Sequence, residues 1–353
     1  MAATSLLRCP LTCAALTTTF SHSLAALSLS TGGASESQTG AVEMLSFRAL
    51  GTMGRLGNQL FQYNFLRSQA RRLGTSFFCP AWDGDAIFAL NDHRERERVD
   101  PNLDQSFTEH PSQLGFDTRA IAIADGTDIA GYFQTWQYVD ARQTGEWFRF
   151  RPDAVSEGRR YLDEVGTKPL AAVHVRLGDF LKGYRDRHYV ARRFFYERAM
   201  APVARTHRIL VFSDEPRRVQ AYLGAMWPDV VVVEGLPAAD DLFLMAHCDR
   251  LACSPSTFSW WAGWLGHRPG REVIVPREGP FRPGAPLHNA DFWPPGWCKR
   301  PALVPIVDHR QCVLLQSTAM RVARRIGWRS ALRGVDSTPG VSPAPKPPVD
   351  VMS

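Results

Sequence analysis

The chain has 353 residues, 44% of them hydrophobic, so it is long enough to form two domains with apolar cores. Its formal net charge of +6 suits an acidic small molecule such as a nucleotide. The core region contains no long basic block interleaved with aromatic residues, so nucleic acid is a weak option. Seven cysteines occur without a Cys-x-x-Cys pair or zinc-ligand spacing, which indicates buried free thiols.

Residues 1–43 are rich in Ala, Ser, Thr and Leu and contain no acidic residue before Glu36. A composition poor in acids and rich in hydroxyls is typical of a targeting leader. An unstructured extension, or a translation start at Met44, explains the segment equally well. We therefore place residues 1–43 outside the fold and leave the compartment open between cytoplasmic and leader-targeted. No apolar run of about 18 residues occurs, so no transmembrane helix is predicted.

Residues 44–52 have the pattern of a first strand, and the apolar residues after them predict a helix that continues to Arg72. Gly54 and Gly57 precede this helix, where free backbone N–H groups can receive an anion. Three side-chain amides lie on nearly one face of the helix: Asn58, Gln59 and Gln62. An ordinary strand–turn–helix explains the same residues, and local chemistry alone favours it.

Asp83 and Asp85 are two carboxylates one residue apart, a pattern that can hold a divalent metal on a nucleotide-sugar. No apolar strand leads into them, so a loop is predicted here. The Arg/Glu run at 93–98 is typical of a solvated face. Residues 101–128 show no regular pattern, and residues 129–138 predict a strand and turn rich in aromatic residues.

From residue 169 onward, strands and helices alternate at short spacing. Strands are predicted at 170–175, 208–212, 230–233, 250–253 and 272–276, and helices at 190–205, 216–227, 239–247 and 257–267. This alternation predicts an α/β fold with parallel β-α-β units in a doubly wound sheet. Residues 151–168 are predicted to be a short helix and linker. They divide an N-terminal α/β domain, 44–165, from a C-terminal Rossmann-like domain, 166–305.

Polar residues follow three of the predicted strands. They are Arg176 and Asp179, then Ser213 and Asp214, then Ser256 and Ser259. Ligands of open α/β sheets bind outside the carboxyl ends of the strands, and the planar fork of an arginine suits a phosphate there. The simpler interpretation is that Arg176 only pairs with Asp179 in a surface loop.

This set combines an arginine, acids and hydroxyls at a helix start, and it lacks a Walker lysine, a Gly-x-Ser-x-Gly elbow and a metal triad. It can bind a nucleoside diphosphate and stabilise it as a leaving group without a metal. Asp214 is a candidate to accept hydrogen bonds from ribose or guanine. A helix N-cap before Pro216 is the competing interpretation of Ser213 and Asp214. Core packing is expected for most aromatic residues of the last helix, which are Phe258, Trp260, Trp261 and Trp264.

Five segments resemble those of the α-1,2-fucosyltransferases, glycosyltransferase family 11. Gly54–Tyr63 resembles the opening Gly-Gly-Leu-Gly-Asn-Gln-Met-Phe-Gln-Tyr, and Gly131–Gln134 with Tyr138 resembles the Gly-Tyr-Phe-Gln segment. His174–Asp179 is similar to the donor motif His-x-Arg-Arg-x-Asp. Phe-Ser-Asp and Ser-Ser-Phe-Ser-Trp-Trp-Ala correspond to residues 212–214 and 256–262. The five matches run in family order across about residues 45–280.

The resemblance implies an inverting transfer of L-fucose from GDP-β-L-fucose to a galactose-containing glycan, with an α-1,2 linkage. It implies a GT-B-like pair of Rossmann-type domains facing a cleft, no metal or other cofactor, and a family-level location in the Golgi or another membrane. Arg176 would hold the β-phosphate, and Asp179 and His174 are candidates for the general base. The implied substrate-binding residues are Gly57, Asn58, Gln59, Gln62, Ser213, Asp214, Ser256, Thr257, Phe258 and Ser259.

The chain departs from the family pattern at four positions. Leu177 replaces the second motif arginine, Arg55 a glycine, Pro255 an asparagine and Thr257 a serine. Loss of the second arginine removes a phosphate contact, so we expect Leu177→Arg to tighten GDP binding. Two alternatives remain open: a metal-dependent transferase that uses Asp83 and Asp85, and a catalytically weak sugar- or nucleotide-binding relative.

Residues 306–353 form a basic and Pro-rich tail. Residues 319–332 are rich in arginine and contain no acidic residue, which suits a helix in peripheral contact with an acidic membrane surface. A solvated tail is the favoured interpretation. Residues 341–351, with four prolines, are predicted to be disordered.

Overall fold

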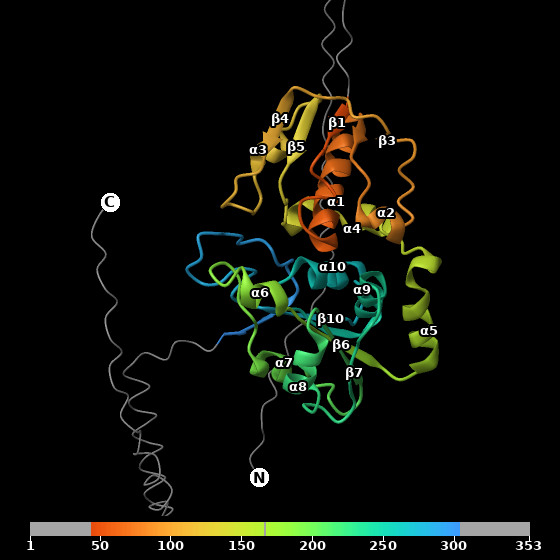
Figure 1. Ribbon diagram of the computed structural model, residues 1–353, viewed down its shortest axis with the longest axis vertical. Coiled ribbons are helices and arrows are strands. Elements are labelled where there is room, and N and C mark those ends of the chain that lie inside the picture. The colour runs from red at the N-terminus through yellow and green to blue at the C-terminus, as the bar shows by residue number, and fades with distance from the viewer. Residues whose placement is uncertain (1–43, 166, 304–353) are drawn as a thin grey trace, which may run out of the picture. The chain divides into compact units, whose positions relative to one another are not determined.

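The structure is a computed structural model that describes residues 44–165 and 167–303. Two parallel β-sheets follow one another along the chain (Figure 1). We call residues 44–155 the N-terminal lobe and residues 156–303 the C-terminal lobe. The predicted leader, 1–43, and the predicted basic tail, 306–353, lie outside the described residues.

The N-terminal lobe contains a parallel sheet in the order β3-β2-β1-β5-β4. Its strands are β1 (Met44–Ser46), β2 (Ser76–Phe78), β3 (Arg96–Glu97), β4 (Gln105–Thr108) and β5 (Thr127–Ala130). Its helices are α1 (Leu56–Leu73), α2 (Asp83–Ile87), α3 (Thr118–Ile121) and α4 (Ala141–Trp147), with 3₁₀ turns η1 (Trp136–Tyr138) and η2 (Pro152–Val155). Most residues of α1 are buried, polar ones included, so α1 is the central helix of this lobe.

Three expectations for this lobe need correction. The first strand ends at Ser46, because the chain turns at residues 48–51 before α1. The loop predicted at Asp83 and Asp85 is the helix α2, whose N-terminus is capped when the Asp85 carboxylate accepts from the Trp82 N–H. Residues 101–128 contain β4 and α3; β4 is polar and mostly exposed, which removes the apolar pattern that would predict a strand.

The C-terminal lobe contains a parallel sheet in the order β11-β10-β9-β6-β7-β8. Its strands are β6 (Leu170–Val175), β7 (Arg208–Ser213), β8 (Val230–Val232), β9 (Arg250–Ala252), β10 (Glu272–Pro276) and β11 (Cys298–Arg300). Its helices are α5 (Ser156–Val165), α6 (Gly178–Lys182), α7 (Arg193–Met200), α8 (Pro216–Leu223), α9 (Ala238–His247) and α10 (Thr257–Leu265). The predicted alternation is confirmed, and β11 and α6 are additions to it. Helix α7 ends earlier than predicted because Pro202 cannot donate a backbone hydrogen bond.

Strand β6 lies at the centre of this sheet. It pairs with β7 on one side and β9 on the other, and all six of its residues are buried. A parallel strand buried on both faces is an almost continuous apolar run, as Leu170–Val175 is. Arg176 therefore follows the central strand, at the edge of the sheet where ligands of such folds bind.

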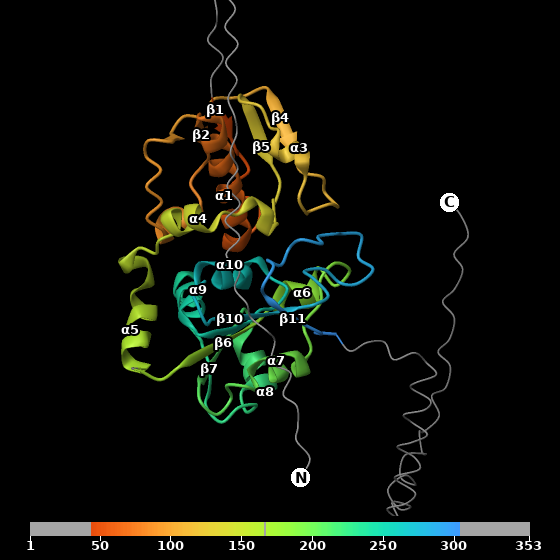
Figure 2. The same ribbon diagram turned by 180° about the vertical axis from the view of Figure 1, so that it is seen from behind.

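The two lobes pack through aromatic residues of α1 and α10, which lie next to each other in Figures 1 and 2. The Phe61 ring lies 4.6 Å from the Trp260 ring and 5.0 Å from the Trp261 ring, between centroids. Both tryptophans are fully buried, so the expected core packing is confirmed for them. One continuous hydrophobic cluster includes residues of both lobes.

Residues 277–297, which we call the return segment, leave β10 and contact the N-terminal lobe before β11 (Figure 2). The His288 N–H donates to the Ser112 carbonyl, and the His288 carbonyl accepts from the Leu114 N–H, both at 3.0 Å. The Asn289 amide donates to the carbonyls of Leu114 and Gln134. The C-terminal half of the chain thus also builds part of the N-terminal lobe's surface.

Among the described residues, Cys79, Cys248 and Cys253 are buried free thiols, as expected, and Cys298 is free and partly exposed. No helix in 44–165 or 167–303 has the length and apolar character needed to cross a membrane.

Candidate functional site

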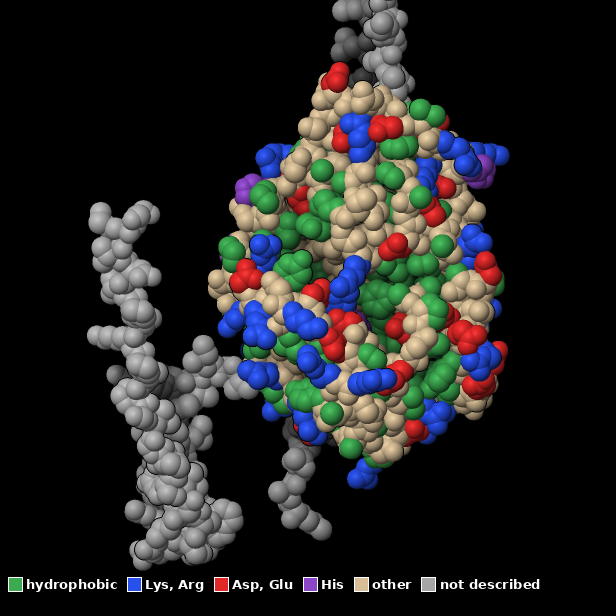
Figure 3. Space-filling view, in the orientation of Figure 1, with side chains coloured by type: hydrophobic (Ala, Val, Ile, Leu, Met, Phe, Trp, Pro, Cys, Tyr) green, Lys and Arg blue, Asp and Glu red, His purple; other side chains and the backbone are tan. Residues whose placement is uncertain are grey.

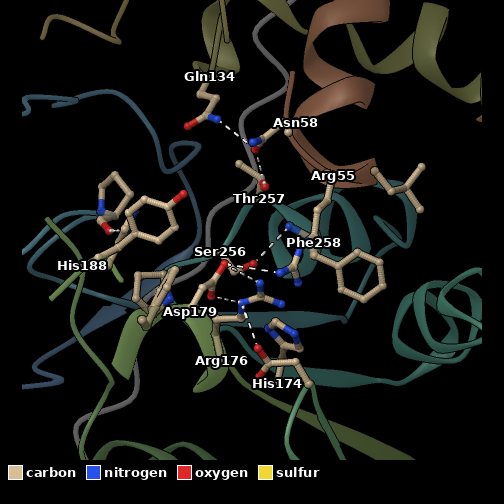
Figure 4. A pocket seen from close by; sticks show the side chains of 18 of the residues that line it. Arg55, Asn58, Gln134, His174, Arg176, Asp179, His188, Ser256, Thr257 and Phe258 are labelled. Carbon is tan, nitrogen blue, oxygen red and sulfur yellow. Dashed lines mark hydrogen bonds and ion pairs between the residues drawn. The ribbon is translucent and has the colours of Figure 1, made fainter. Parts of the chain in front are cut away.

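A pocket of about 910 Å³ lies between the two lobes (Figure 4). The C-terminal lobe contributes residues that follow β6, β7, β8 and β9, and the N-terminal lobe contributes the start of α1 and residues 132 and 134. This volume is in the range of pockets that enclose a cofactor-sized ligand. Figure 3 shows Lys and Arg side chains gathered on the face of the C-terminal lobe around α6 and α7. They favour the approach of an anionic ligand.

Arg176 lies within this pocket with 15% of its side chain exposed. Its Nε and Nη2 donate to the two oxygens of Asp179 at 2.9 and 2.8 Å, so the pair predicted as the simpler interpretation is present. Asp214 Oδ2 lies 3.2 Å from the same Nε. The two carboxylates hold the guanidinium plane in place, and Nη1 takes part in neither contact. Arg176 is therefore oriented in the pocket before any ligand arrives.

Asp214 closes the turn between β6 and α6. Its oxygens accept from the backbone N–H groups of Leu177 at 3.0 Å and Gly178 at 3.1 Å. A Cβ on Gly178 would lie 2.6 Å from Asp214 Oδ2, so a side chain there would displace the Asp214 carboxylate. Ser213 Oγ accepts from the Glu215 N–H at the start of α8. Both residues line the pocket while shaping its floor, and the hydrogen bonds from Asp214 to ribose or guanine stay a prediction.

Leu177 does not line the pocket. Its side chain is 6% exposed and packs with Val175, Val211 and neighbouring residues in the core on one face of the β6–β7 sheet. An arginine here would have to bury its charge or distort the turn that Asp214 holds. The structure therefore reverses the expectation that Leu177→Arg tightens GDP binding.

We expect Leu177→Arg to destabilise the protein by about 3 kcal/mol or more, because an unpaired buried charge costs several kcal/mol. Thermal unfolding should show a lower Tm, and titration with GDP should show no gain in affinity. Leu177→Met, which keeps an apolar side chain of similar volume, is the control and should unfold near the wild-type temperature. Tighter GDP binding by a stably folded Leu177→Arg protein would restore the original expectation.

The N-terminus of α10 forms the wall beside Arg176. Ser256 is its N-cap and accepts from the Phe258 N–H, and Thr257 and Phe258 line the pocket. Ser259 is fully buried, does not line the pocket and donates to the carbonyls of Ser254 and Ser256. A helix N-terminus and a fixed guanidinium on one pocket wall form a strong anion site.

Asn58 joins the two lobes at the pocket wall (Figure 4). Its Oδ1 accepts from Gln134 Nε2 at 3.0 Å and from Thr257 Oγ1 at 2.9 Å. Gly57 lies against α10, where an added Cβ would be 2.6 Å from the Phe258 nitrogen. Three of the five segments that resemble family 11 therefore meet at this point.

Gln59 and Gln62 are buried and do not line the pocket. Gln59 donates to the Gly54 carbonyl and accepts from the Asp83 N–H. Gln62 donates to the carbonyls of Met53 and Gly131. Both amides hold the loop before α1, so in this structure they position Gly57 and Asn58 and do not face the cavity.

The two candidate bases are poorly suited to take up a proton. His174 is buried, its Nδ1 lies 2.7 Å from Ser254 Oγ, and burial, helped by the Arg176 charge, lowers its pKa to about 3. For Asp179, burial opposes ionisation, but the hydrogen bonds and charge of Arg176 prevail and lower its pKa. Neither group is a strong base near neutral pH.

The paired aspartates of the N-terminal lobe do not act together. Asp83 is exposed and lines the pocket, whereas Asp85 pairs with Arg96 at 2.5 Å. Arg96 is 16% exposed, so the predicted solvated face is wrong at this residue. No cluster of three or more His, Cys, Asp or Glu side chains that could hold a metal occurs in the described parts of the chain. The metal hypothesis retains one carboxylate of its two.

Among the residues that line the pocket, sequence reasoning missed one carboxylate, Asp241, and one imidazole, His188. Asp241 lies in the first turn of α9, and its Oδ1 is buried without a hydrogen-bond partner among the described residues. Burial, and secondarily the charge of Asp240, raise the pKa of Asp241 to about 7. His188 lies in the irregular stretch after α6. Asp241 lies inside a predicted helix, and no motif surrounds either residue in the sequence.

Residues 154–297 match the model of glycosyl transferase family 11, which confirms the predicted resemblance over that part of the chain. A structure of POFUT1 in complex with GDP is similar at 11% identity, covering 67% of this chain and 98% of that chain with a TM-score of 0.47. The fucosyltransferase NodZ from Bradyrhizobium is similar at 14% identity, covering 62% and 92% with a TM-score of 0.41. A search of curated proteins found no match.

Proposed function

We propose that this protein, a glycosyltransferase of family 11 by its residues 154–297, transfers L-fucose from GDP-β-L-fucose to a galactose-containing glycan and forms an α-1,2 linkage. The observation that carries the proposal is the joint placement of Arg176 and the N-terminus of α10 on one pocket wall. These groups are suited to the diphosphate of a nucleotide-sugar. The linkage and the acceptor follow from the resemblance of the five segments.

In an inverting transfer, the acceptor oxygen attacks the anomeric carbon as the bond to the β-phosphate oxygen breaks. Negative charge grows on the departing diphosphate, so groups fixed near it lower the barrier. Arg176 is already oriented by Asp179 and Asp214, and the dipole of α10 adds partial positive charge. This arrangement stabilises the leaving group with side chains and backbone alone.

Asp241 is suited to bind the guanine ring of the donor. It lies beyond the edge strand β8, and Leu236 and Ala238 line the pocket beside it. An ionised carboxylate accepts two hydrogen bonds from the N1–H and amino group of guanine, and adenine has no donor at N1. The buried Oδ1 without a partner is the group that such a contact would satisfy.

We expect Asp241→Asn to weaken GDP binding by about 10-fold or more, the size of a lost hydrogen bond to a charged group. Weak binding of ADP should not change. With a pKa of about 7 the carboxylate ionises as pH rises, so wild-type GDP affinity should increase through this pH, and the variant should lose that increase. Calorimetric titration with GDP and ADP between pH 6 and 8 measures all three. Equal GDP affinity for variant and wild type would remove Asp241 from the base subsite.

The acceptor belongs at the opposite end of the pocket. Tyr132 and Leu114 of the N-terminal lobe meet Phe281 and Leu287 of the return segment there, in a small apolar cluster that lines the cavity. Aromatic and aliphatic surfaces of this kind suit the apolar face of a pyranose ring. Both lobes would then be required for the acceptor to bind.

The test is incubation with GDP-fucose and a panel of galactose-terminated glycans, with and without a chelator. The proposal expects fucosylated product in both conditions, and NMR of the product should show attachment at the 2-hydroxyl of galactose. The metal-dependent alternative expects no product with chelator and an Asp83→Ala loss as large as that of Arg176→Ala. Binding of GDP-fucose without transfer of fucose to any acceptor in the panel would favour the alternative of a catalytically weak sugar- or nucleotide-binding relative.

A further inference from the structure

The pocket contains six side chains that can accept a proton, and three of them are already engaged. His174 is buried against Ser254, Asp179 is paired with Arg176, and Asp214 accepts two backbone N–H groups. Asp241 lies at the start of α9, beyond β8. Asp83 is exposed on the N-terminal lobe. The sixth is His188, which follows α6.

His188 is fixed by aromatic contacts. Its ring stacks on Phe180 with centroids 4.3 Å apart and planes 7° from parallel, and Tyr184 and Phe281 contact it from two further sides. The Nδ1 atom lies 3.4 Å from the Pro280 carbonyl oxygen. A carbonyl can only accept, so this contact favours the tautomer with the proton on Nδ1 and a lone pair on Nε2.

His188 also lies at the end of the pocket where the sugar of the donor belongs. Its partner Pro280 follows β10, whereas Asp241 follows β8, and β6 with Arg176 lies between these strands. Figure 4 shows His188 across the pocket from Phe258. If guanine lies at Asp241 and the β-phosphate at Arg176, the anomeric carbon points toward His188 and the apolar cluster proposed for the acceptor.

We propose that His188 is the general base of the transfer, an inference that rests on the proposed function. Nε2 takes the proton of the acceptor hydroxyl while its oxygen bonds to C1 of fucose. The bond from C1 to the β-phosphate oxygen breaks, and GDP leaves with the bonding electrons. The imidazolium then returns the proton to water.

The charges around His188 are consistent with this role. Burial lowers its pKa below the ordinary value, and the Arg187 charge acts in the same direction. The Pro280 carbonyl and the charges of Asp179 and Asp186 oppose the shift without reversing it. The imidazole is therefore neutral at pH 7, and kcat should fall only as pH drops below its pKa.

The test compares wild type and His188→Gln in kcat at saturating GDP-fucose and acceptor, from pH 5 to 8. We expect the variant to lose about 100-fold in kcat, the lower range for general-base catalysis, and to lose the acid limb of its pH profile. The KM for GDP-fucose and the affinity for GDP should stay within about 2-fold of wild type, because the donor contacts are elsewhere. Added imidazole should raise kcat of His188→Ala.

His93→Gln, an exposed histidine of the N-terminal lobe outside the pocket, is the matched control and should behave as wild type. If Asp83→Asn loses about 100-fold in kcat while His188→Gln stays near wild type, the general base is Asp83 and the inference is overturned. If wild type is active and His188→Gln has the same kcat, the role of His188 is overturned and the proposed function is not. An inactive wild type with every acceptor overturns the proposed function and the role of His188 together.

Discussion

Arg176→Ala is expected to reduce transfer by about 10³-fold or more. A single fixed donor to a developing oxyanion is worth about 10²–10³ in kcat, and an arginine at a transferring phosphate about 10³–10⁵. The substitution also leaves Asp179 and Asp214 near the diphosphate without the guanidinium that contacts both, and among the described residues only Arg55, 3.6 Å from Asp179, still pairs with one of them. Two carboxylates next to an anion repel it, so GDP affinity should fall with kcat.

Two further variants separate these effects. Arg176→Ala combined with Asp179→Asn removes one repelling charge and should recover part of the GDP affinity, with kcat still low. Arg193→Ala removes an exposed arginine outside the pocket and should stay near wild type. Initial rates with GDP-fucose and titrations with GDP give the two numbers. A single Arg176→Ala variant within about 10-fold of wild type in both would contradict the assignment of the phosphate site.

Trp260→Ala is expected to cost about 3–5 kcal/mol of stability, the range for deleting a large buried aromatic side chain. The indole is fully buried, packs on Phe61, and donates from Nε1 to the Phe292 carbonyl at 2.7 Å. The substitution therefore opens a cavity between the lobes and leaves a buried carbonyl of the return segment without its donor.

Denaturant unfolding followed by far-UV circular dichroism measures this loss. Trp260→Phe retains most of the aromatic volume but lacks the Nε1–H donor. It should therefore lose less stability than the alanine variant. If the free energy of unfolding of Trp260→Ala is within about 1 kcal/mol of the wild-type value, the contact between α1 and α10 is not a principal source of stability.

The sequence allowed the C-terminal sheet to be predicted almost completely, for a physical reason. Strands buried on both faces are short apolar runs, and β6 and β10 were predicted with the bounds that the structure has. Parallel topology then placed Arg176 at a ligand-binding edge without any knowledge of side-chain contacts. The edge strand β4 was not predicted, because a polar and mostly exposed strand has no periodic pattern of apolar residues.

The candidate site was harder to predict because its chemistry depends on contacts between distant residues. The motif placed Leu177 beside Arg176 as if both faced a phosphate. The chain leaves β6 at this point and begins α6, and the Leu177 side chain lies in the core. Gln59 and Gln62 share a helix face with Asn58, yet only Asn58 reaches the pocket wall. His188 could not be predicted as a site residue, because its contacts with Pro280 and Phe281 join residues about 90 positions apart in the sequence.

The aromatic contact between α1 and α10 has a consequence for how ligands enter. Interfaces between domains that swing apart are usually modest and polar. Here Phe61 with Trp260 and Trp261, and Phe148 with Trp261, form an apolar junction that is continuous with the core of each lobe. Separating the lobes would expose these aromatic rings to water, which opposes such a motion. Donor and acceptor are therefore expected to diffuse in through the open side of the pocket, where residues 183–187 after α6 are exposed.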